Sequence, residues 1–135
     1  LVLSRESRAK TAPLARIIGH AAHAQAPALF TTAPVFAVRK LLDRIGWRAS
    51  DVDLFEINEA FAVVALVAMR ELDIAPDRIN VHGGACALGH PIGASGARIL
   101  ATLISALRAK RLKRGVASLC IGGGEATAMA VEIAR

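Results

Sequence analysis

The sequence has few of the features that mark membrane, disulfide-rich or nucleotide-binding proteins. Its longest uninterrupted apolar run, residues 60–69, is far shorter than the roughly 20 residues of a membrane-spanning helix. The only two cysteines, Cys86 and Cys120, lie beside glycine-rich segments rather than in a disulfide framework, which favours a reduced, cytoplasmic setting. Neither a Walker A sequence nor a dinucleotide-binding glycine fingerprint is present, so these two phosphate-binding loops are excluded.

Aromatic residues are also scarce, at 4% of the chain, whereas positive charge is in excess, with a formal net charge of +6. Much of this charge lies in residues 108–114, at the end of a predicted helix, where cations complement the helix dipole. No aromatic side chain interleaves with the cluster to stack on a base. We therefore interpret the cluster as a solvated helix end and expect neither a nucleic acid nor a membrane as a partner.

The chain instead repeats short apolar runs and helical patterns in alternation. Such alternation predicts an α/β domain with a mixed five-stranded sheet covered by helices. The clearest helical pattern, residues 32–45, has Thr32 at the N-cap, Pro34 in the first turn and Gly46 as its stop. The other predicted helices are 59–71 and 94–111, and the predicted strands are 15–20, 52–57, 79–81, 116–121 and 126–133.

A glycine-rich segment, residues 80–96, joins a predicted strand to a predicted helix. Glycines at such a turn adopt backbone conformations that other residues avoid, and they let a ligand approach the bare amides. Pro91 pushes His90 into an extended conformation, at the mouth of a helix whose free N–H groups favour negative charge. The segment therefore predicts a histidine that stabilises an oxyanion or moves a proton.

Two further segments place polar groups at strand ends. Cys120 lies at the end of a predicted strand, beside a glycine run at 122–124, where a thiol can approach a substrate carbonyl or its α-carbon. Asn58 follows the predicted strand 52–57 and is either the N-cap of the next helix or an uncharged donor near the strand end. We expect such groups to gather at one edge of the sheet, where strands end and helices begin.

Three motifs therefore occur in order: N-E-A-F at 58–61, G-H-P at 89–91 followed by S-G at 95–96, and C-I-G-G-G at 120–124. Together they resemble the C-terminal domain of the thiolases, the family of acetyl-CoA acetyltransferases and 3-ketoacyl-CoA thiolases. The resemblance covers nearly the whole chain. It implies half of a five-layered αβαβα sandwich, with residues 13–135 as the C-terminal domain and residues 1–12 as a possible end of the N-terminal domain.

The resemblance also assigns roles to individual residues. It implies that His90 activates a nucleophilic cysteine and helps to form an oxyanion hole, in which Asn58 orients a water. Cys120 is implied to be the acid and base that handles the α-proton of the acetyl unit. The amide of Gly122 is implied to belong to a second oxyanion hole, and Phe61 to lie near the pantetheine arm of coenzyme A.

The reaction implied for the parent enzyme is cleavage of a 3-ketoacyl-CoA by coenzyme A, or the reverse Claisen condensation of two acyl-CoA molecules. Acyl-CoA and coenzyme A are then substrates, and no metal or organic cofactor is required. The family further implies a partner in the N-terminal half of the same enzyme and assembly into a homodimer or homotetramer.

The chain departs from the family pattern mainly by what it lacks. The nucleophilic cysteine of the family lies in an N-terminal motif, and the insertion with most coenzyme A contacts is also missing here. Cys86 stands where the family has a small or apolar residue. The chain begins at Leu1 without a methionine, and residues 1–6 have the pattern of a strand entered midway. We interpret the sequence as an inactive fragment that holds half of an active site, and an organellar origin stays open.

Alternative interpretations exist for the fold family and for single residues. The chain could be a non-catalytic thiolase-like scaffold or binding domain, or a ketoacyl-synthase-type condensing enzyme, although the latter carries histidine or asparagine where Cys120 stands. Asn58 could serve only as a helix cap, and Cys120 could be an inert buried thiol. His82, Cys86 and His90 have a spacing that a metal could use, but they offer three ligands and no obvious fourth.

Overall fold

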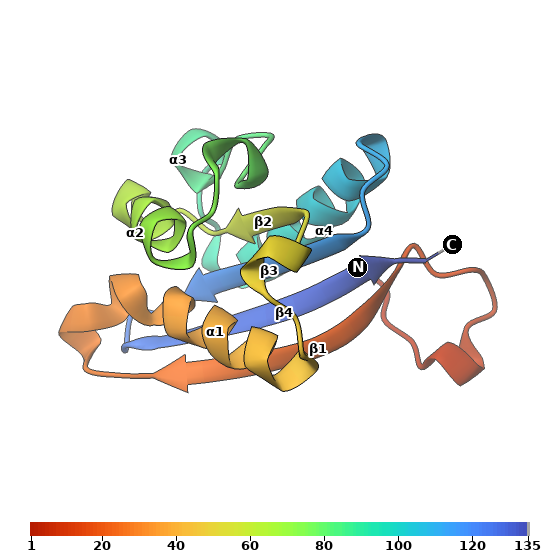
Figure 1. Cartoon of the computed structure of the whole chain (residues 1–135), viewed down its shortest axis with the longest axis horizontal. Helices are drawn as coiled ribbons and strands as arrows, with labels where there is room; N and C mark the ends of the chain where they lie inside the picture. Colours follow the sequence, from red (N-terminus) through yellow and green to blue (C-terminus); the bar gives the residue numbers. More distant parts are fainter. Residues whose placement is uncertain (135) are drawn as a thin grey trace.

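A mixed four-stranded sheet forms the centre of the computed structural model, which describes residues 1–134 (Figure 1). The strand order is β1-β4-β3-β2, in which β1 pairs antiparallel with β4, β4 antiparallel with β3, and β3 parallel with β2. The strands are β1 (Ala15–Ala24), β2 (Leu54–Ile57), β3 (Arg114–Cys120) and β4 (Glu125–Ile133). The predicted α/β class with a mixed sheet is confirmed.

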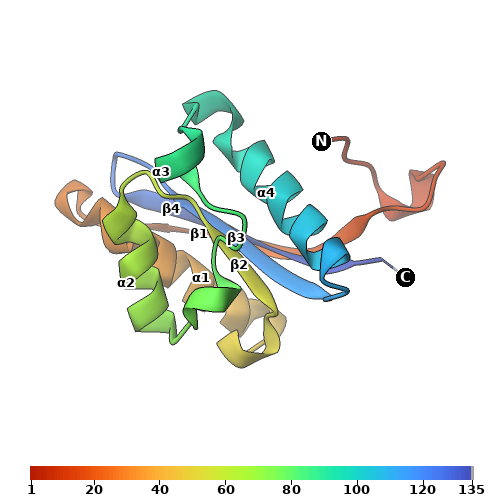
Figure 2. The same ribbon diagram turned by 90° about the horizontal axis from the view of Figure 1, so that it is seen from above.

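Helices cover both faces of the sheet, as Figure 2 shows from above. Helices α1 (Ala33–Ile45) and α2 (Ala62–Leu72) pack on one face in the larger apolar core, and α4 (Ile92–Ala109) packs on the other in a smaller one. A short helix, α3 (Ala85–Leu88), lies within the glycine-rich segment. The 3₁₀ turns are η1 (Glu6–Arg8), η2 (Pro27–Thr32), η3 (Ala49–Asp51) and η4 (Pro76–Arg78).

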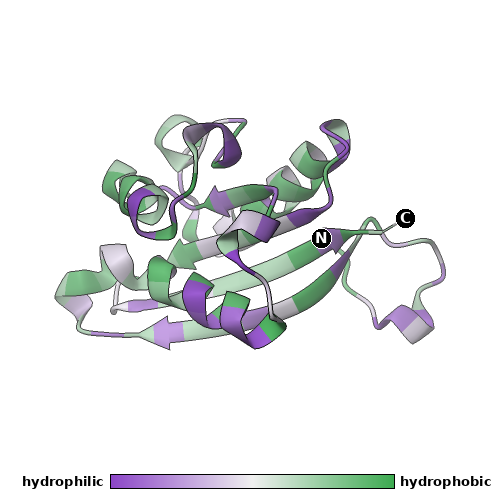
Figure 3. Cartoon of the chain, in the orientation of Figure 1, coloured by the Kyte–Doolittle hydropathy of each residue, from purple (hydrophilic) through white to green (hydrophobic). Residues whose placement is uncertain are grey.

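A local signal sets the C-terminal end of α1. Gly46 ends the helix in the left-handed region, with φ of 71°, which favours glycine. Thr32 stands at the N-cap position as predicted, but its hydroxyl donates to the carbonyl of Leu29 instead of capping the helix. The helix is amphipathic, and the alternation of apolar and polar residues along α1 is visible in Figure 3.

The predicted fifth strand, residues 79–81, does not form. Ile79 makes one isolated parallel bridge to Phe55, and the backbone then turns at Asn80, whose φ of 46° is incompatible with an extended strand. The Asn80 side chain continues the pairing in place of the backbone, because its Oδ1 accepts from the Ile57 N–H at 2.9 Å and its Nδ2 donates to the Ile57 carbonyl at 2.8 Å. The prediction of five strands is therefore wrong.

The predicted strand at residues 1–6 is also wrong. Residues 1–14 are exposed and contain only the 3₁₀ turn η1, which Arg16 contacts through an ion pair with Glu6. Ala15, the first residue of β1, pairs with Ile133 at the end of β4, and the Ala134 N–H donates to the Leu14 carbonyl at 3.2 Å, but residues 1–6 lie opposite no strand of the sheet. A strand needs such a partner for its backbone hydrogen bonds.

Within residues 1–134, α4 is the one helix long and apolar enough, by length and composition, to cross a membrane. The core helix of a soluble protein passes the same test. Here α4 packs on β2 and β3 through Ile99, Leu103, Ala106 and Leu107, all of which are buried. Packing against the sheet therefore accounts for the apolar residues on the buried face of α4.

The turn between β3 and β4 provides a test of the fold. At Gly124, φ is +100° and a Cβ atom would lie 2.2 Å from the Gln25 carbonyl oxygen, whereas a Cβ at Gly122 would meet nothing within 4 Å. Gly124→Ala should lower the free energy of unfolding by at least about 2 kcal/mol, and Gly122→Ala should leave it nearly unchanged. Urea unfolding of both variants measures the difference, and equal stabilities would contradict this account.

Candidate active site

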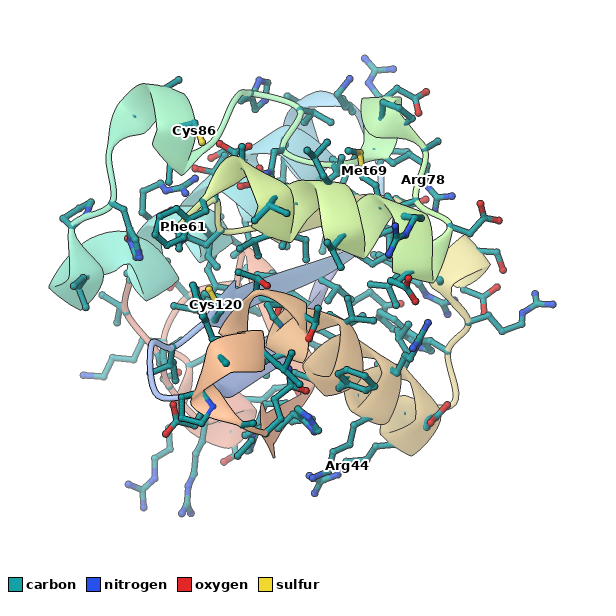
Figure 4. The ribbon with its side chains drawn as sticks, turned by 90° about the vertical axis from the view of Figure 1, so that its left-hand side faces the viewer. Arg44, Phe61, Met69, Arg78, Cys86 and Cys120 are labelled. Carbon is teal, nitrogen blue, oxygen red and sulfur yellow. The ribbon has the colours of Figure 1, made fainter. Side chains whose placement is uncertain are left out.

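Three predicted site segments meet at the carboxyl ends of the parallel strands β2 and β3. Asn58 directly follows β2, and its N–H donates to the Ser118 carbonyl of β3 at 2.9 Å. Cys120 is the last residue of β3, two positions beyond Ser118. Figure 4 looks onto the molecule from this side, with Phe61 drawn between Cys86 and Cys120. The sheet therefore brings the first and third motifs, which contain Asn58 and Cys120, to one edge, as expected.

The first contact at this edge joins Asn58 to His90. The Nδ2 atom of Asn58, a fully buried residue, lies 3.3 Å from Nε2 of His90. On the other side of the ring, His90 Nδ1 lies 2.6 Å from the hydroxyl of Ser95, which in turn donates to the Pro91 carbonyl at 3.1 Å. The imidazole is thus held from both ring nitrogens.

The helix-cap interpretation of Asn58 is wrong. Helix α2 begins at Ala62, and its N-cap residue is Phe61, which makes no capping hydrogen bond through its side chain. The Asn58 amide instead contacts His90 and Arg98. Of the two interpretations of this residue, the donor near the strand end is therefore the one that fits the structure.

Arg98 and Glu56 extend the site, and the sequence interpretation missed both. From α4, the Arg98 guanidinium reaches Asn58 Oδ1 at 3.3 Å and Glu56 Oε2 at 3.4 Å. Glu56 is only 1% exposed, and its other oxygen, Oε1, has no hydrogen-bond partner among the described residues. A charged residue inside the apolar run 52–57 was the available signal, because a buried carboxylate requires a partner.

Burial raises the pKa of the Glu56 carboxyl to about 7. Arg98 opposes this rise by stabilising the charged form, and the nearby negative charge of Glu59 adds to it. Near neutral pH, Glu56 therefore exists in both protonation states, and it is the carboxyl group of the site with the most strongly perturbed pKa.

Glu59, the acidic residue of the N-E-A-F motif, fastens the glycine-rich segment to the end of β2. Its Oε1 accepts from Asn80 Nδ2 at 2.9 Å, and its Oε2 accepts from the Cys86 N–H at 3.0 Å. A Cβ atom at Gly84 would lie 2.3 Å from the Glu59 carboxyl carbon, so only glycine allows this approach. The missing side chain at Gly84 therefore makes room for the Glu59 carboxylate of the same chain.

Cys120 is a free, buried thiol, and its burial raises its pKa above the ordinary value. A backbone hydrogen bond opposes this effect but is the smaller influence. In this chain the residue is therefore a protonated thiol near neutral pH, not an activated thiolate. Gly122 lies beyond it, exposed in the turn to β4.

Phe61 stands in extended conformation just before α2 and is 60% exposed. Its ring makes an edge contact with Phe30, with centroids 5.9 Å apart. Other large apolar residues at this end of the molecule are exposed as well; they are Leu88, Ile92 and Ile121. Each of these three lies within two residues of His90 or Cys120, so they form an exposed apolar rim beside the site.

The structure does not support the metal site considered as an alternative for His82, Cys86 and His90. Residues 1–134 contain no group of three or more His, Cys, Asp or Glu side chains placed to hold an ion. Cys86 is an exposed free thiol whose pKa is raised by partial desolvation and by the adjacent Glu59 carboxylate. A cavity of about 410 Å³ lies away from this site, at the other end of α4, beside Arg108 and Arg111.

The two hydrogen bonds that Glu59 accepts from Asn80 and Cys86 can be tested with Glu59→Gln. The variant retains one acceptor oxygen and presents an NH₂ group to a second donor, so at least one of the two hydrogen bonds is lost. We expect unfolding to become easier by about 1–2 kcal/mol and the Cys86 amide to exchange faster with solvent. Glu71→Gln, on the exposed side of α2, is the matched control. An unchanged rate of amide exchange at Cys86 would contradict this role of Glu59.

The raised pKa of Glu56 predicts a pH dependence of stability. Between the ordinary value of 4.5 and about 7, the folded chain holds a proton that the unfolded chain has released, so the free energy of unfolding falls as pH rises. The fall should approach about 3 kcal/mol and be missing in Glu56→Gln. Denaturant unfolding from about pH 4.5 to 7.5 measures it, and parallel curves for the two proteins would refute the assignment.

Comparison with known proteins places this geometry in a family. Residues 11–133 match the family described as thiolase, C-terminal domain. The chain is 57% identical over 119 residues to acetyl-CoA acetyltransferase 1 of Arabidopsis thaliana, with 88% of this chain and 29% of that protein covered. It is 55% identical over 135 residues to a probable acetyl-CoA acetyltransferase of Dictyostelium discoideum, covering 98% and 33%.

A solved structure agrees. The Bacillus anthracis acetyl-CoA acetyltransferase superimposes with a TM-score of 0.88 at 44% identity, over 90% of this chain and 31% of that one. The chain thus spans about a third of the length of the relatives it matches. On the family match, the sequence identity and the shared fold, this chain belongs to the thiolases and corresponds to their C-terminal domain.

Proposed function

We propose that this chain is the C-terminal catalytic part of an acyltransferase that cleaves a 3-ketoacyl-CoA with coenzyme A or runs the reverse condensation. The observation that carries the proposal is the contact of the Asn58 amide with His90 Nε2, beside the end of the strand that holds Cys120. Relatives with this domain are named acetyl-CoA acetyltransferases, which gives the acyl transfer its substrate class.

The chemical problem of this reaction is the negative charge that develops on a thioester oxygen when the α-carbon becomes a carbanion. Donors fixed before the reaction stabilise such charge most effectively, because they need no rearrangement. His90 is held through both ring nitrogens, and Asn58 is fully buried, so both are fixed in this sense. The Asn58 amide would face the oxyanion directly or through a bound water, and His90 would donate to it from Nε2 once that nitrogen has taken the thiol proton.

Cys120 would exchange the α-proton. In the cleavage direction, its S–H gives a proton to the carbanion of the departing acetyl-CoA and becomes a thiolate, which regains a proton from the incoming coenzyme A thiol. The raised pKa of the buried thiol supports this assignment, since the group rests in the protonated form that the cleavage step consumes. The Gly122 amide, in the adjoining turn, is available for the second oxyanion hole.

The remaining parts of the proposal concern the whole enzyme. Phe61 would contact the pantetheine arm from its exposed position at the start of α2. The exposed rim of Leu88, Ile92 and Ile121 supports an N-terminal half that covers this edge and completes the αβαβα sandwich with the nucleophilic cysteine. We further propose a cytoplasmic homodimer or homotetramer that needs no metal or organic cofactor.

A catalytically inert scaffold is the main alternative, and an assay separates it from the enzyme. Thiolysis of acetoacetyl-CoA is measured with this chain alone and after mixing with, or fusion to, the N-terminal part of the Bacillus anthracis relative. We expect no activity alone and activity in the assembled form. An assembled, folded protein without activity would indicate a scaffold, and activity of the chain alone would indicate a nucleophile within it.

Cys120→Ala in the assembled enzyme should lower the thiolysis rate by at least about 100-fold, because the α-carbon loses its proton donor. Acylation of the N-terminal cysteine, detected by protein mass, should persist. Cys86→Ala is the matched control and should retain the wild-type rate. Full thiolysis activity in Cys120→Ala would overturn the assigned role.

A further inference from the structure

A continuous line of polar contacts runs from β2 through α4 to the loop that carries His90. It begins at Glu56, passes through Arg98 and Asn58 to His90, and ends at Ser95 and the Pro91 carbonyl. Its first members are buried or nearly so: Glu56 is 1% exposed, Asn58 0% and the Arg98 side chain 22%. Because water has little access, each group must satisfy its neighbour.

The order of donors and acceptors along this line follows from chemistry at one end. A guanidinium has only donors, so the Asn58 atom that faces Arg98 must be the carbonyl oxygen. The amide NH₂ group then faces His90, and an NH₂ group can only donate. His90 Nε2 must therefore be the acceptor, which leaves the proton of the neutral ring on Nδ1, where it is donated to Ser95.

We propose that Arg98, anchored by Glu56, is a positioning residue that fixes the orientation of the Asn58 amide and thereby the tautomer of His90. Without a cation on its oxygen side, an asparagine amide can turn over and exchange its oxygen and nitrogen at little cost. Turned over, it would present an acceptor to Nε2 and favour the opposite tautomer. Arg98 prevents this because its donors would then meet the donors of the NH₂ group.

A purely structural role for the pair would not require this arrangement. A salt bridge that only ties α4 to β2 is satisfied by Glu56 and Arg98 alone, yet the guanidinium divides its donors between the carboxylate and the amide. The catalytic consequence rests on the proposed function. In the Nδ1–H tautomer, the Nε2 lone pair, which the Asn58 N–H occupies at rest, accepts the proton of the nucleophilic thiol when that N–H gives way to it. The second Asn58 N–H remains for a water or an oxyanion.

The test reads the tautomer directly and does not depend on activity. Long-range ¹H–¹⁵N correlation spectra of the imidazoles, recorded at about pH 8 where an ordinary histidine is neutral, distinguish a protonated from an unprotonated ring nitrogen. In the wild-type chain, Nε2 of His90 should resonate in the unprotonated range and Nδ1 in the protonated range. The reverse pattern, or an average of both, would overturn the proposal.

Arg98→Met removes the guanidinium, and the Nε2 resonance should then move toward the average of the two tautomers. Since this variant leaves Glu56 buried without its cation, it risks unfolding. The double variant Glu56→Leu with Arg98→Met removes the pair together, which buried ion pairs often tolerate, and the same shift is expected. A folded double variant that keeps the wild-type resonances would refute the role of Arg98.

Two further variants calibrate the measurement. Arg78→Met removes another partly buried arginine, whose guanidinium donates to backbone carbonyls beside β2, and should leave the His90 resonances unchanged. Asn58→Asp presents only acceptors when ionised, so it should move the proton to Nε2. If the variants shift the tautomer but the assembled protein with the wild-type sequence lacks thiolysis activity, the positioning role is upheld and the proposed function is rejected. The two failures are therefore distinguishable.

Discussion

The burial of polar groups at the end of β2 is the constraint on which the rest of this structure depends. Three polar residues lie where this apolar strand ends: Glu56 and Asn58, which are buried, and Glu59, which is half-buried. A buried polar group without a partner costs about 1–3 kcal/mol or more. Their partners come from distant segments: Arg98 of α4, His90 before it, and Asn80 and Cys86 of the glycine-rich segment. The end of β2 thus holds both α4 and the glycine-rich segment in place.

These contacts divide the task of building the site. Glu59 holds the backbone of the glycine-rich segment, whereas Arg98 holds a side-chain amide. β2 pairs in parallel with β3, and Ile57 lies opposite Ser118. This pairing also places Cys120, the last residue of β3, near the end of β2. These polar contacts all lie within the chain, while the apolar side chains beside them are exposed.

Much of the fold could be predicted because its signals are local. Gly46 ends α1 through its own backbone preference, and the apolar runs of β3 and β4 identify strands without reference to their neighbours. The predicted fifth strand failed because a side chain replaces the backbone there. Asn80 pairs with Ile57 through its amide group, so residues 79–81 have the composition of a strand without forming one.

The sequence by itself determined the kind of domain and the reactive groups it carries, because glycine runs, a histidine before proline and a cysteine at a strand end are recognisable in order along the chain. Only the tertiary structure decided what each group contacts. That Asn58 faces His90 and not a helix terminus, and that Glu56 and Arg98 meet behind it, depends on packing α4 against β2, which joins residues 40 and 42 positions apart. No local pattern encodes such a contact, since it results from the burial of two apolar surfaces.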